Sequence, residues 1–196
     1  MSGLHKQLLK KHQLLNQSIE LLSNVIKKFE ADVMDELELA TKQNFFYLLD
    51  ASGLAILKDV KIARDYTIEV LNNYSQPFLA NISQGQRQVL SLSFITALAQ
   101  VAGGTKALEI PLFMDTPFGR LSDQHQENLI KYLPQICSQW VLLVTDKEFG
   151  PSEQNQFLES GAIGRFYELI SKEAGVTEIH EVPEYEYKSG GVEHYG

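Results

Sequence analysis

The sequence contains a single cysteine, Cys137, among 196 residues. One cysteine excludes an intramolecular disulfide and indicates a reducing, cytoplasmic location. Basic residues are outnumbered, with 17 Lys and Arg against 25 Asp and Glu and a net charge of −8. This balance argues against a basic nucleic-acid-binding module. No apolar run is long enough to cross a bilayer and no signal peptide is evident, so we expect no membrane partner.

Several kinds of catalytic site are also missing. The five histidines are scattered and lack the spacing of metal ligands. Ser83 has no histidine and aspartate near it in the sequence, so a serine hydrolase is not supported. No Gly-x-x-x-x-Gly-Lys-Ser/Thr occurs, because Gly103-Gly104-Thr105-Lys106 has the residue types without the spacing. The chain therefore lacks a P-loop for the β-phosphate of a nucleotide.

The N-terminal third carries apolar residues at a regular spacing. From Leu15 onward the steps alternate between four and three residues, which is the heptad pattern of a coiled coil. We expect a helix to about Leu48, where Asp50 to Gly53 would end it. The helix is either packed on its own domain, or one strand of an antiparallel coiled coil whose other strand lies outside this chain, or the core of a heptad-driven oligomer. The heptad positions are Leu15, Ile19, Leu22, Ile26, Phe29 and Val33.

A second long helix is predicted after Ser83. Ser83 and Gln86 form a capping box, in which each side chain bonds the other residue's backbone N–H. Gly85 leaves the first turn without a side chain, so that a bulky partner can approach the backbone. A helix N-terminus with free N–H groups suits a phosphate, although a plain N-capped core helix is the better interpretation of this stretch taken alone.

The C-terminal half reads as an α/β fold. An apolar strand from Ile110 ends at Asp115, a helix spans Gln124 to Leu133, and a second apolar strand from Trp140 is followed by Asp146. Continuous apolar runs of this length predict buried parallel strands, and the strand–helix–strand order predicts a right-handed unit. Two short antiparallel strands, at 60–62 and 66–71, and a terminal hairpin, at 165–170 and 176–182, are also expected.

These motifs, taken in order, resemble a known family. ISQGQ, IPLFMDTPFGRLSD and WVLLVTD are similar to the C-terminal half of an ABC-type ATPase head, and more narrowly to SMC-like heads. Within these, DTPFGRLS followed by VLLVTD most resembles the DndD family of DNA sulfur modification proteins. The resemblance implies the C-terminal lobe of an ABC/SMC-type P-loop NTPase head, with parallel strands and flanking helices, preceded by a coiled-coil stub.

The resemblance also implies roles for individual residues. Asp115 would hold Mg²⁺ through water, while Thr116 stands where the family has its catalytic Glu and is a poor general base. Asp146 stands at the switch-histidine position and is a candidate stand-in base. The signature loop that would contact ATP on a partner head comprises Ser83, Gln84, Gly85 and Gln86, and the D-loop at the dimer interface comprises Gly119, Arg120, Leu121, Ser122 and Asp123.

We therefore expect three parts: a coiled-coil stub at 1–34, a C-terminal ATPase head lobe at 35–182 and a poorly structured tail at 183–196. The expected activity is an ATPase that is incomplete without a P-loop-bearing N-terminal half, either because the chain is a fragment or because it is truncated. The expected cofactors are ATP and Mg²⁺. The expected partners are that N-terminal half, a second head in a homodimer, DNA through backbone contacts, and other modification or defence proteins.

The function implied is ATP-driven closure of two heads in a DNA-directed process, either phosphorothioate modification or a linked defence system. A recombination or repair SMC-like ATPase is the alternative within the class. A non-hydrolysing interaction lobe derived from an ABC ATPase is the alternative outside it. In each case, the strand edge left by the absent lobe predicts exposed apolar surface and self-association.

Overall fold

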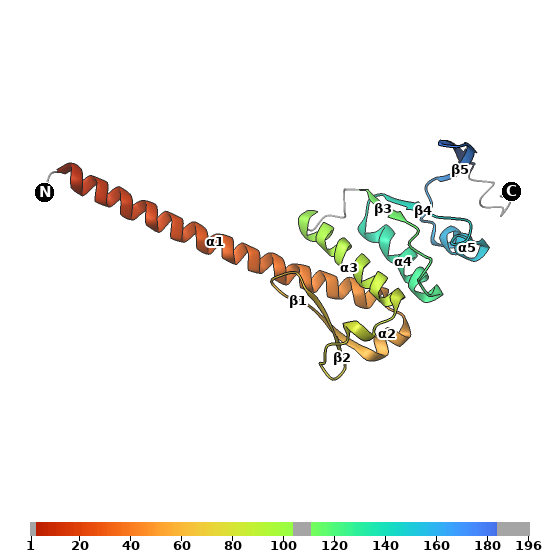
Figure 1. The fold of residues 1–196 in the computed structure, drawn as a ribbon, viewed down its shortest axis with the longest axis horizontal. Helices are drawn as coiled ribbons and strands as arrows, with labels where there is room; N and C mark the ends of the chain where they lie inside the picture. The colour runs from red at the N-terminus through yellow and green to blue at the C-terminus, as the bar shows by residue number, and fades with distance from the viewer. Residues whose placement is uncertain (1–2, 104–110, 184–196) are drawn as a thin grey trace.

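A single helix of 46 residues, α1 (Gly3–Leu48), extends away from the rest of the molecule (Figure 1). The computed structural model describes residues 3–103 and 111–183. At 1.5 Å per residue, α1 is roughly 70 Å long. Side chains 5–32 are all exposed, and we call this segment the stalk. The predicted helix and its end at Leu48 are confirmed. The expected boundaries at 34 and 182 stay predictions, and the tail from 184 lies outside the described residues.

The C-terminal part of α1 packs along α3 (Gln84–Gly103). Phe45 and Leu48 are fully buried in the main core, where Val89 of α3 also lies. The hydrophobic effect thus joins the helix that continues the stalk to the helix whose N-terminus carries the capping box.

A buried polar network reinforces this junction. The Asn44 side-chain N–H group donates to Thr96 Oγ1 at 3.0 Å and to Gln100 Oε1 at 3.1 Å, and its oxygen accepts from the Tyr132 hydroxyl. Burial raises the pKa of Tyr132, so its hydroxyl stays protonated and able to donate. One amide on α1 therefore holds side chains of α3 and of α4 (Asp123–Ile136) together.

The sequence predicted that residues 50–53 only end the first helix, but in the structure they begin a second one. The Asp50 carboxylate accepts from the Gly53 N–H at 2.8 Å and caps the short helix α2 (Ala51–Ile56). The residues predicted to end one helix therefore begin the next, because aspartate is a strong N-cap.

An antiparallel pair of strands, β1 (Leu57–Ile62) and β2 (Ile68–Asn72), follows α2, and a one-turn 3₁₀ helix (Leu79–Asn81) leads from them to α3. The predicted pairing is confirmed, with shifted boundaries. β1 begins earlier than expected and β2 later, because 63–67 form the connection.

The α/β unit consists of β3 (Leu112–Asp115), α4 and β4 (Trp140–Leu143), and the two strands are parallel as predicted. The prediction that they are buried is wrong for most positions. Met114 is buried, whereas Phe113 is 68% exposed and Leu143 is 44% exposed. A parallel strand is covered on both faces only where elements pack on both sides, and among the described residues this sheet has two strands, with Leu112, Trp140 and Leu142 packed against the main core.

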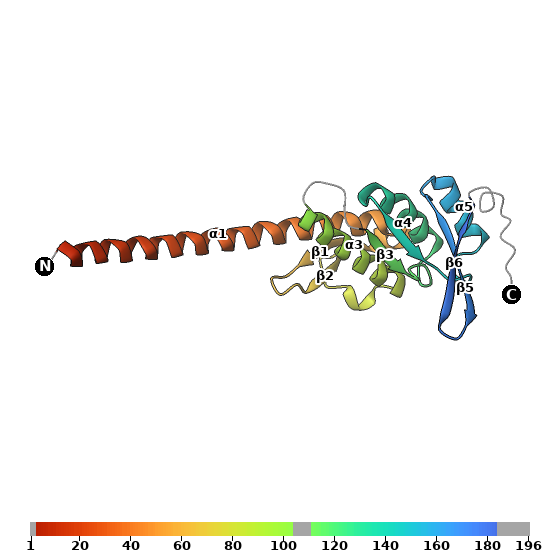
Figure 2. The same cartoon turned by 90° about the horizontal axis from the view of Figure 1, so that it is seen from above.

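The last described elements are α5 (Pro151–Ser160) and the antiparallel hairpin of β5 (Phe166–Glu173) and β6 (Val176–Val182). The hairpin is confirmed. The loop predicted at 150–152 is instead the start of α5, because proline is well suited to the first turn of a helix. Seen from above, the hairpin lies at the end of the molecule opposite the N-terminus of α1 (Figure 2).

Candidate functional site

The first turn of α3 has the predicted capping box. The Ser83 N–H donates to Gln86 Oε1 at 3.0 Å, and the Gln86 N–H donates to Ser83 Oγ at 3.1 Å. Ser83 and Gln84 are exposed at the surface of the lobe. The positive end of the helix is therefore accessible to an anion that approaches from outside.

Gly85 allows a close contact within the chain itself. A Cβ atom built at Gly85 would lie 2.7 Å from the carbonyl oxygen of Arg120, a separation that no side chain tolerates. The bulky partner expected at this glycine is thus the chain's own backbone. One turn further along α3, the Gln88 side-chain N–H group donates to the Pro117 carbonyl. The start of α3 is therefore docked on the segment 117–120.

The backbone is strained where β3 ends. Thr116 has a φ of 46°, although it is β-branched and precedes a proline. Such a conformation costs on the order of 1–3 kcal/mol and recurs at functional sites. The Thr116 N–H donates to the Leu143 carbonyl of β4 at 2.8 Å, which holds the bend in place. The bend turns residues 117–120 back toward α3.

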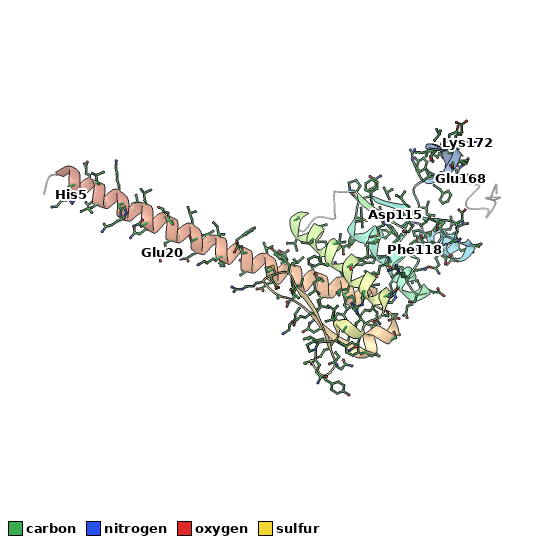
Figure 3. All side chains as sticks on the ribbon, in the orientation of Figure 1. His5, Glu20, Asp115, Phe118, Glu168 and Lys172 are labelled. Carbon is green, nitrogen blue, oxygen red and sulfur yellow. The ribbon has the colours of Figure 1, made fainter. Side chains whose placement is uncertain are left out.

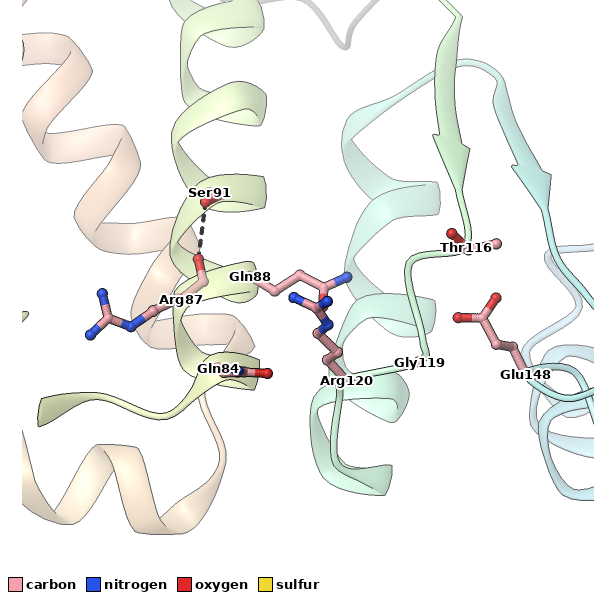
Figure 4. Close-up of a pocket in the computed structure, with 8 residues that line it drawn as sticks. All are labelled: Gln84, Arg87, Gln88, Ser91, Thr116, Gly119, Arg120 and Glu148. Atoms are coloured by element: carbon pink, nitrogen blue, oxygen red, sulfur yellow. Dashed lines mark hydrogen bonds between the residues drawn. The ribbon is translucent and has the colours of Figure 1, made fainter. Parts of the chain in front are cut away.

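Between α3 and this bend lies an open cleft of about 580 Å³ (Figure 4). Ser91 Oγ donates to the Arg87 carbonyl on its α3 wall. Four residues chosen from the sequence line the cleft, and four others were missed. The lining residues are Gln84, Thr116, Gly119 and Arg120, which the sequence identified, and Arg87, Gln88, Ser91 and Glu148, which it did not.

The other candidate residues do not line this cleft. Asp115 and Asp146 are both exposed, and Asp146 lies in the turn that follows β4. Asp115 lies close to Phe118 in the view of Figure 3, far from His5 and Glu20 on the stalk. The remaining candidates outside the lining set are Ser83, Gly85, Gln86, Leu121, Ser122 and Asp123.

Among the lining residues that the sequence analysis did not identify, Glu148 packs against a glycine and has a buried carboxylate oxygen. A Cβ atom at Gly119 would lie 2.6 Å from Glu148 Oε1, so the carboxylate sits against the bare backbone of that glycine. Its other oxygen, Oε2, is buried and has no hydrogen-bond partner in the described part of the chain. The sequence signal available was a second acid two residues after Asp146.

A polar cluster behind the cleft connects three helix N-termini. Ser122 is the N-cap of α4, and its hydroxyl lies 3.0 Å from His125 Nδ1. His125 Nε2 lies 3.6 Å from Asp50 Oδ1, the cap of α2. Burial raises the pKa of Asp50, but hydrogen bonds from Gly53 and Ser52 lower it overall, with smaller contributions from His125 and from Gln86 of the α3 capping box. Burial lowers the pKa of His125, and the nearby Asp50 carboxylate opposes that shift only in part.

The electrostatics suit a phosphorylated ligand better than a protein-bound metal. Arg120 and the N-terminal region of α3 border the cleft, as does Arg87, whose guanidinium donates to the Ala80 carbonyl at 2.9 Å. No group of three or more His, Cys, Asp or Glu side chains with metal-binding geometry occurs among the residues that the structure describes. Mg²⁺ keeps several waters and needs only one or two carboxylates beside substrate phosphates, so the exposed Asp115 carboxylate suits it.

Across 3–103 and 111–183, no helix has the length and apolarity needed to cross a membrane.

Comparison with known proteins gives a fold assignment. No protein-family model and no curated protein matches the sequence. Among solved structures, an SMC head domain with a coiled coil and joint from Pyrococcus yayanosii aligns with a TM-score of 0.60 at 13% identity, over 94% of this chain and 34% of that one. The expected α/β lobe with a long N-terminal helix is confirmed.

Two further structures give the same fold. An SMC ATPase studied for ATP-driven dimerization and DNA-stimulated activation aligns with a TM-score of 0.56 at 11% identity, over 85% of this chain and 92% of that one. An SMC head bound to the C-winged helix domain of ScpA aligns with a TM-score of 0.54 at 9% identity, over 80% and 45%. The chain thus spans nearly all of one neighbour and less than half of the others.

Proposed function

We propose that this chain is one lobe of an SMC-like ATPase head, in which ATP is bound between two heads and hydrolysed. The observation that carries the proposal is the cleft that joins Gln84 of the helix N-terminus, Thr116 at the end of β3, and Gly119–Arg120. Two residues of the predicted D-loop and one of the predicted signature loop line it, although 35 positions separate Gln84 from Gly119 in the sequence.

Each element has a role in this proposal. The exposed N-terminus of α3, with Ser83, Gln84 and Gln86, binds the γ-phosphate of ATP held by a partner head. Asp115 holds Mg²⁺ through a bound water, and the ion neutralises charge that develops on the phosphates. Residues 119–123 form the contact between heads.

The stalk gives the proposal its mechanical part. Apolar residues of the stalk are exposed along its length, among them Leu15, Ile19, Leu22 and Ile26. An outside helix that covers this seam completes an antiparallel coiled coil. Closure of two heads is then transmitted along the coiled coil to DNA, which is contacted through its backbone. The process it serves is phosphorothioate modification or a linked defence system, which rests on the DTPFGRLS and VLLVTD motifs.

The test is ATP turnover by this chain, alone and mixed with a P-loop-bearing half of an SMC-like head. We expect the chain alone to be inert and the mixture to hydrolyse ATP. In the mixture, Asp115→Asn and Ser83→Ala should each lower turnover. Asp32→Asn and Ser18→Ala make the same chemical changes on the exposed stalk and should leave turnover unchanged.

Two results would contradict the proposal. Tight binding of MgATP by the chain alone would mean that it holds a complete nucleotide site of another kind. Turnover in the mixture that is unaffected by Asp115→Asn would remove the assigned magnesium role. Stimulation of the active mixture by DNA that weakens as salt rises would support backbone contacts with DNA.

A second candidate is a lobe that pairs with other heads without hydrolysing ATP. Thr116 supports it, because a threonine hydroxyl does not accept a proton near neutral pH. On this reading, ATP drives association of the mixture but no phosphate is released. Measurement of association and of phosphate release on the same sample separates the two candidates.

A further inference from the structure

We infer that Glu148 is the general base of the proposed ATPase reaction, in place of the glutamate that Thr116 replaces. This inference rests on the proposed function. It concerns which side chain activates water, a role for which the sequence had offered only Asp146.

The location of Glu148 supports this role first. It lies in the turn after β4, where its N–H donates to the Thr145 carbonyl at 2.9 Å. Its side chain reaches from the β4 side of the cleft toward Thr116, at the end of the neighbouring parallel strand (Figure 4). Asp146, two residues earlier, is exposed and does not line the cleft.

The contact with Gly119 is the second argument. Glu148 Oε1 occupies the space that a side chain at 119 would need, with 2.6 Å between the oxygen and a Cβ atom built there. A glycine at this point lets the carboxylate reach the bend that follows Thr116. The carboxylate is therefore held beside the position from which a Glu at 116 would extend.

The third argument is the unpartnered oxygen. Glu148 Oε2 is buried and accepts no hydrogen bond from any described residue. A buried acceptor without a donor costs about 1–3 kcal/mol, and more when it is charged. Glu148 lines the cleft, so a water held between its carboxylate and the γ-phosphate would supply the missing donor once the side chain turns this oxygen toward the cleft.

The chemical step balances with these groups. The water oxygen forms a bond to the γ-phosphorus, while the bond from that phosphorus to the β,γ-bridging oxygen breaks and its electron pair leaves with ADP. One proton of the water passes to the Glu148 carboxylate, which later releases it to solvent. Such proton transfer accelerates a reaction typically by 10²–10⁴-fold.

The experiment compares Glu148→Gln with Glu159→Gln in the full chain, mixed with the P-loop-bearing half. Glu159 is an exposed glutamate of α5 outside the cleft, so its substitution is the matched control. We expect Glu148→Gln to lower kcat by roughly 100-fold or more while ATP-driven association, measured by size-exclusion chromatography, stays intact. The amide also removes an unpartnered buried charge, so the Tm of the chain alone should be unchanged or higher.

Three results would overturn the inference. Turnover by Glu148→Gln at the rate of the control would show that the base lies elsewhere, with the proposed function intact. Loss of association together with turnover, or a clear fall in Tm, would make Glu148 a binding or structural residue. If the unsubstituted mixture neither binds nor hydrolyses ATP, the proposed function itself fails, and the base role fails with it.

Discussion

The two ends of α1 carry similar apolar side chains in different surroundings. Phe29 on the stalk is 66% exposed, whereas Phe45, sixteen residues later on the same helix, is completely buried. Leu15 and Ile19 are likewise exposed, whereas Leu48 is buried. Amphipathic spacing therefore marks a surface that needs a partner without indicating where the partner is. In the C-terminal part the partner is α3 of the same chain, and on the stalk none of the described residues covers the seam.

The largest difference between the two parts of α1 is expected when one phenylalanine of each part is replaced by alanine. Phe45→Ala should lower the free energy of unfolding by about 3–5 kcal/mol, because it leaves a cavity in the core. Phe29→Ala should change it by less than about 0.5 kcal/mol, because the ring is already in water. Urea unfolding of both variants measures the difference. Equal losses would show that the stalk is packed in solution.

Two asparagines of α1 allow the same comparison for polar side chains, one in the α1–α3–α4 junction and one on the stalk. Asn44→Ala should cost about 1–3 kcal/mol, because it leaves the Tyr132 hydroxyl and Gln100 Oε1 without their partner. Asn24→Ala, at an exposed stalk position, is the control and should be near neutral. Thermal unfolding by circular dichroism reports both. A neutral Asn44→Ala would show that water replaces the lost amide.

Acid should destabilise the folded chain through His125. Its pKa is lowered in the folded state from an ordinary value of 6.5, so the unfolded chain binds more protons between the folded pKa and 6.5. Stability is therefore complete above pH 6.5 and falls as pH drops below it. The pKa of Asp50 is also lowered, which adds a further loss as pH falls below about 3.8.

His125→Gln should flatten the part of the Tm profile just below pH 6.5, an effect smaller than that of Asn44→Ala. His12→Gln removes an exposed imidazole of the stalk and serves as the control. Thermal unfolding at closely spaced pH values measures both variants. A His125→Gln profile identical to that of the unsubstituted chain would mean that another group carries the dependence.

The smallest effect on stability is expected from charges placed on the stalk seam. Ile19→Glu with Ile26→Glu should leave the free energy of unfolding of the chain unchanged within about 0.5 kcal/mol. The double substitution should nevertheless reduce self-association of the chain through the stalk, because a charge at a heptad core position weakens a coiled coil. Analytical ultracentrifugation compares it with Ser23→Glu. Undiminished association of the double variant would place the contact on the exposed strands β3 and β4 instead.

Elements that depend on local spacing could be predicted from the amino-acid order alone. The long helix that ends at Leu48 and the capping box of Ser83 and Gln86 appeared as expected. These features arise from hydrogen bonds or side-chain periodicity within a few residues, so a short window of sequence contains their causes.

Which residues contact one another depends on the packing of distant segments. The close approach of Gly85 to the Arg120 carbonyl, the exposure of Phe113 and the position of Glu148 beside Gly119 depend on how distant segments pack. Four of the residues predicted for the site line one cleft, but the sequence pointed to Asp146 rather than Glu148. Spacing along the chain gives the order of the polar groups, whereas only the packing of α3 against the bend at Thr116 determines which of them share a cleft.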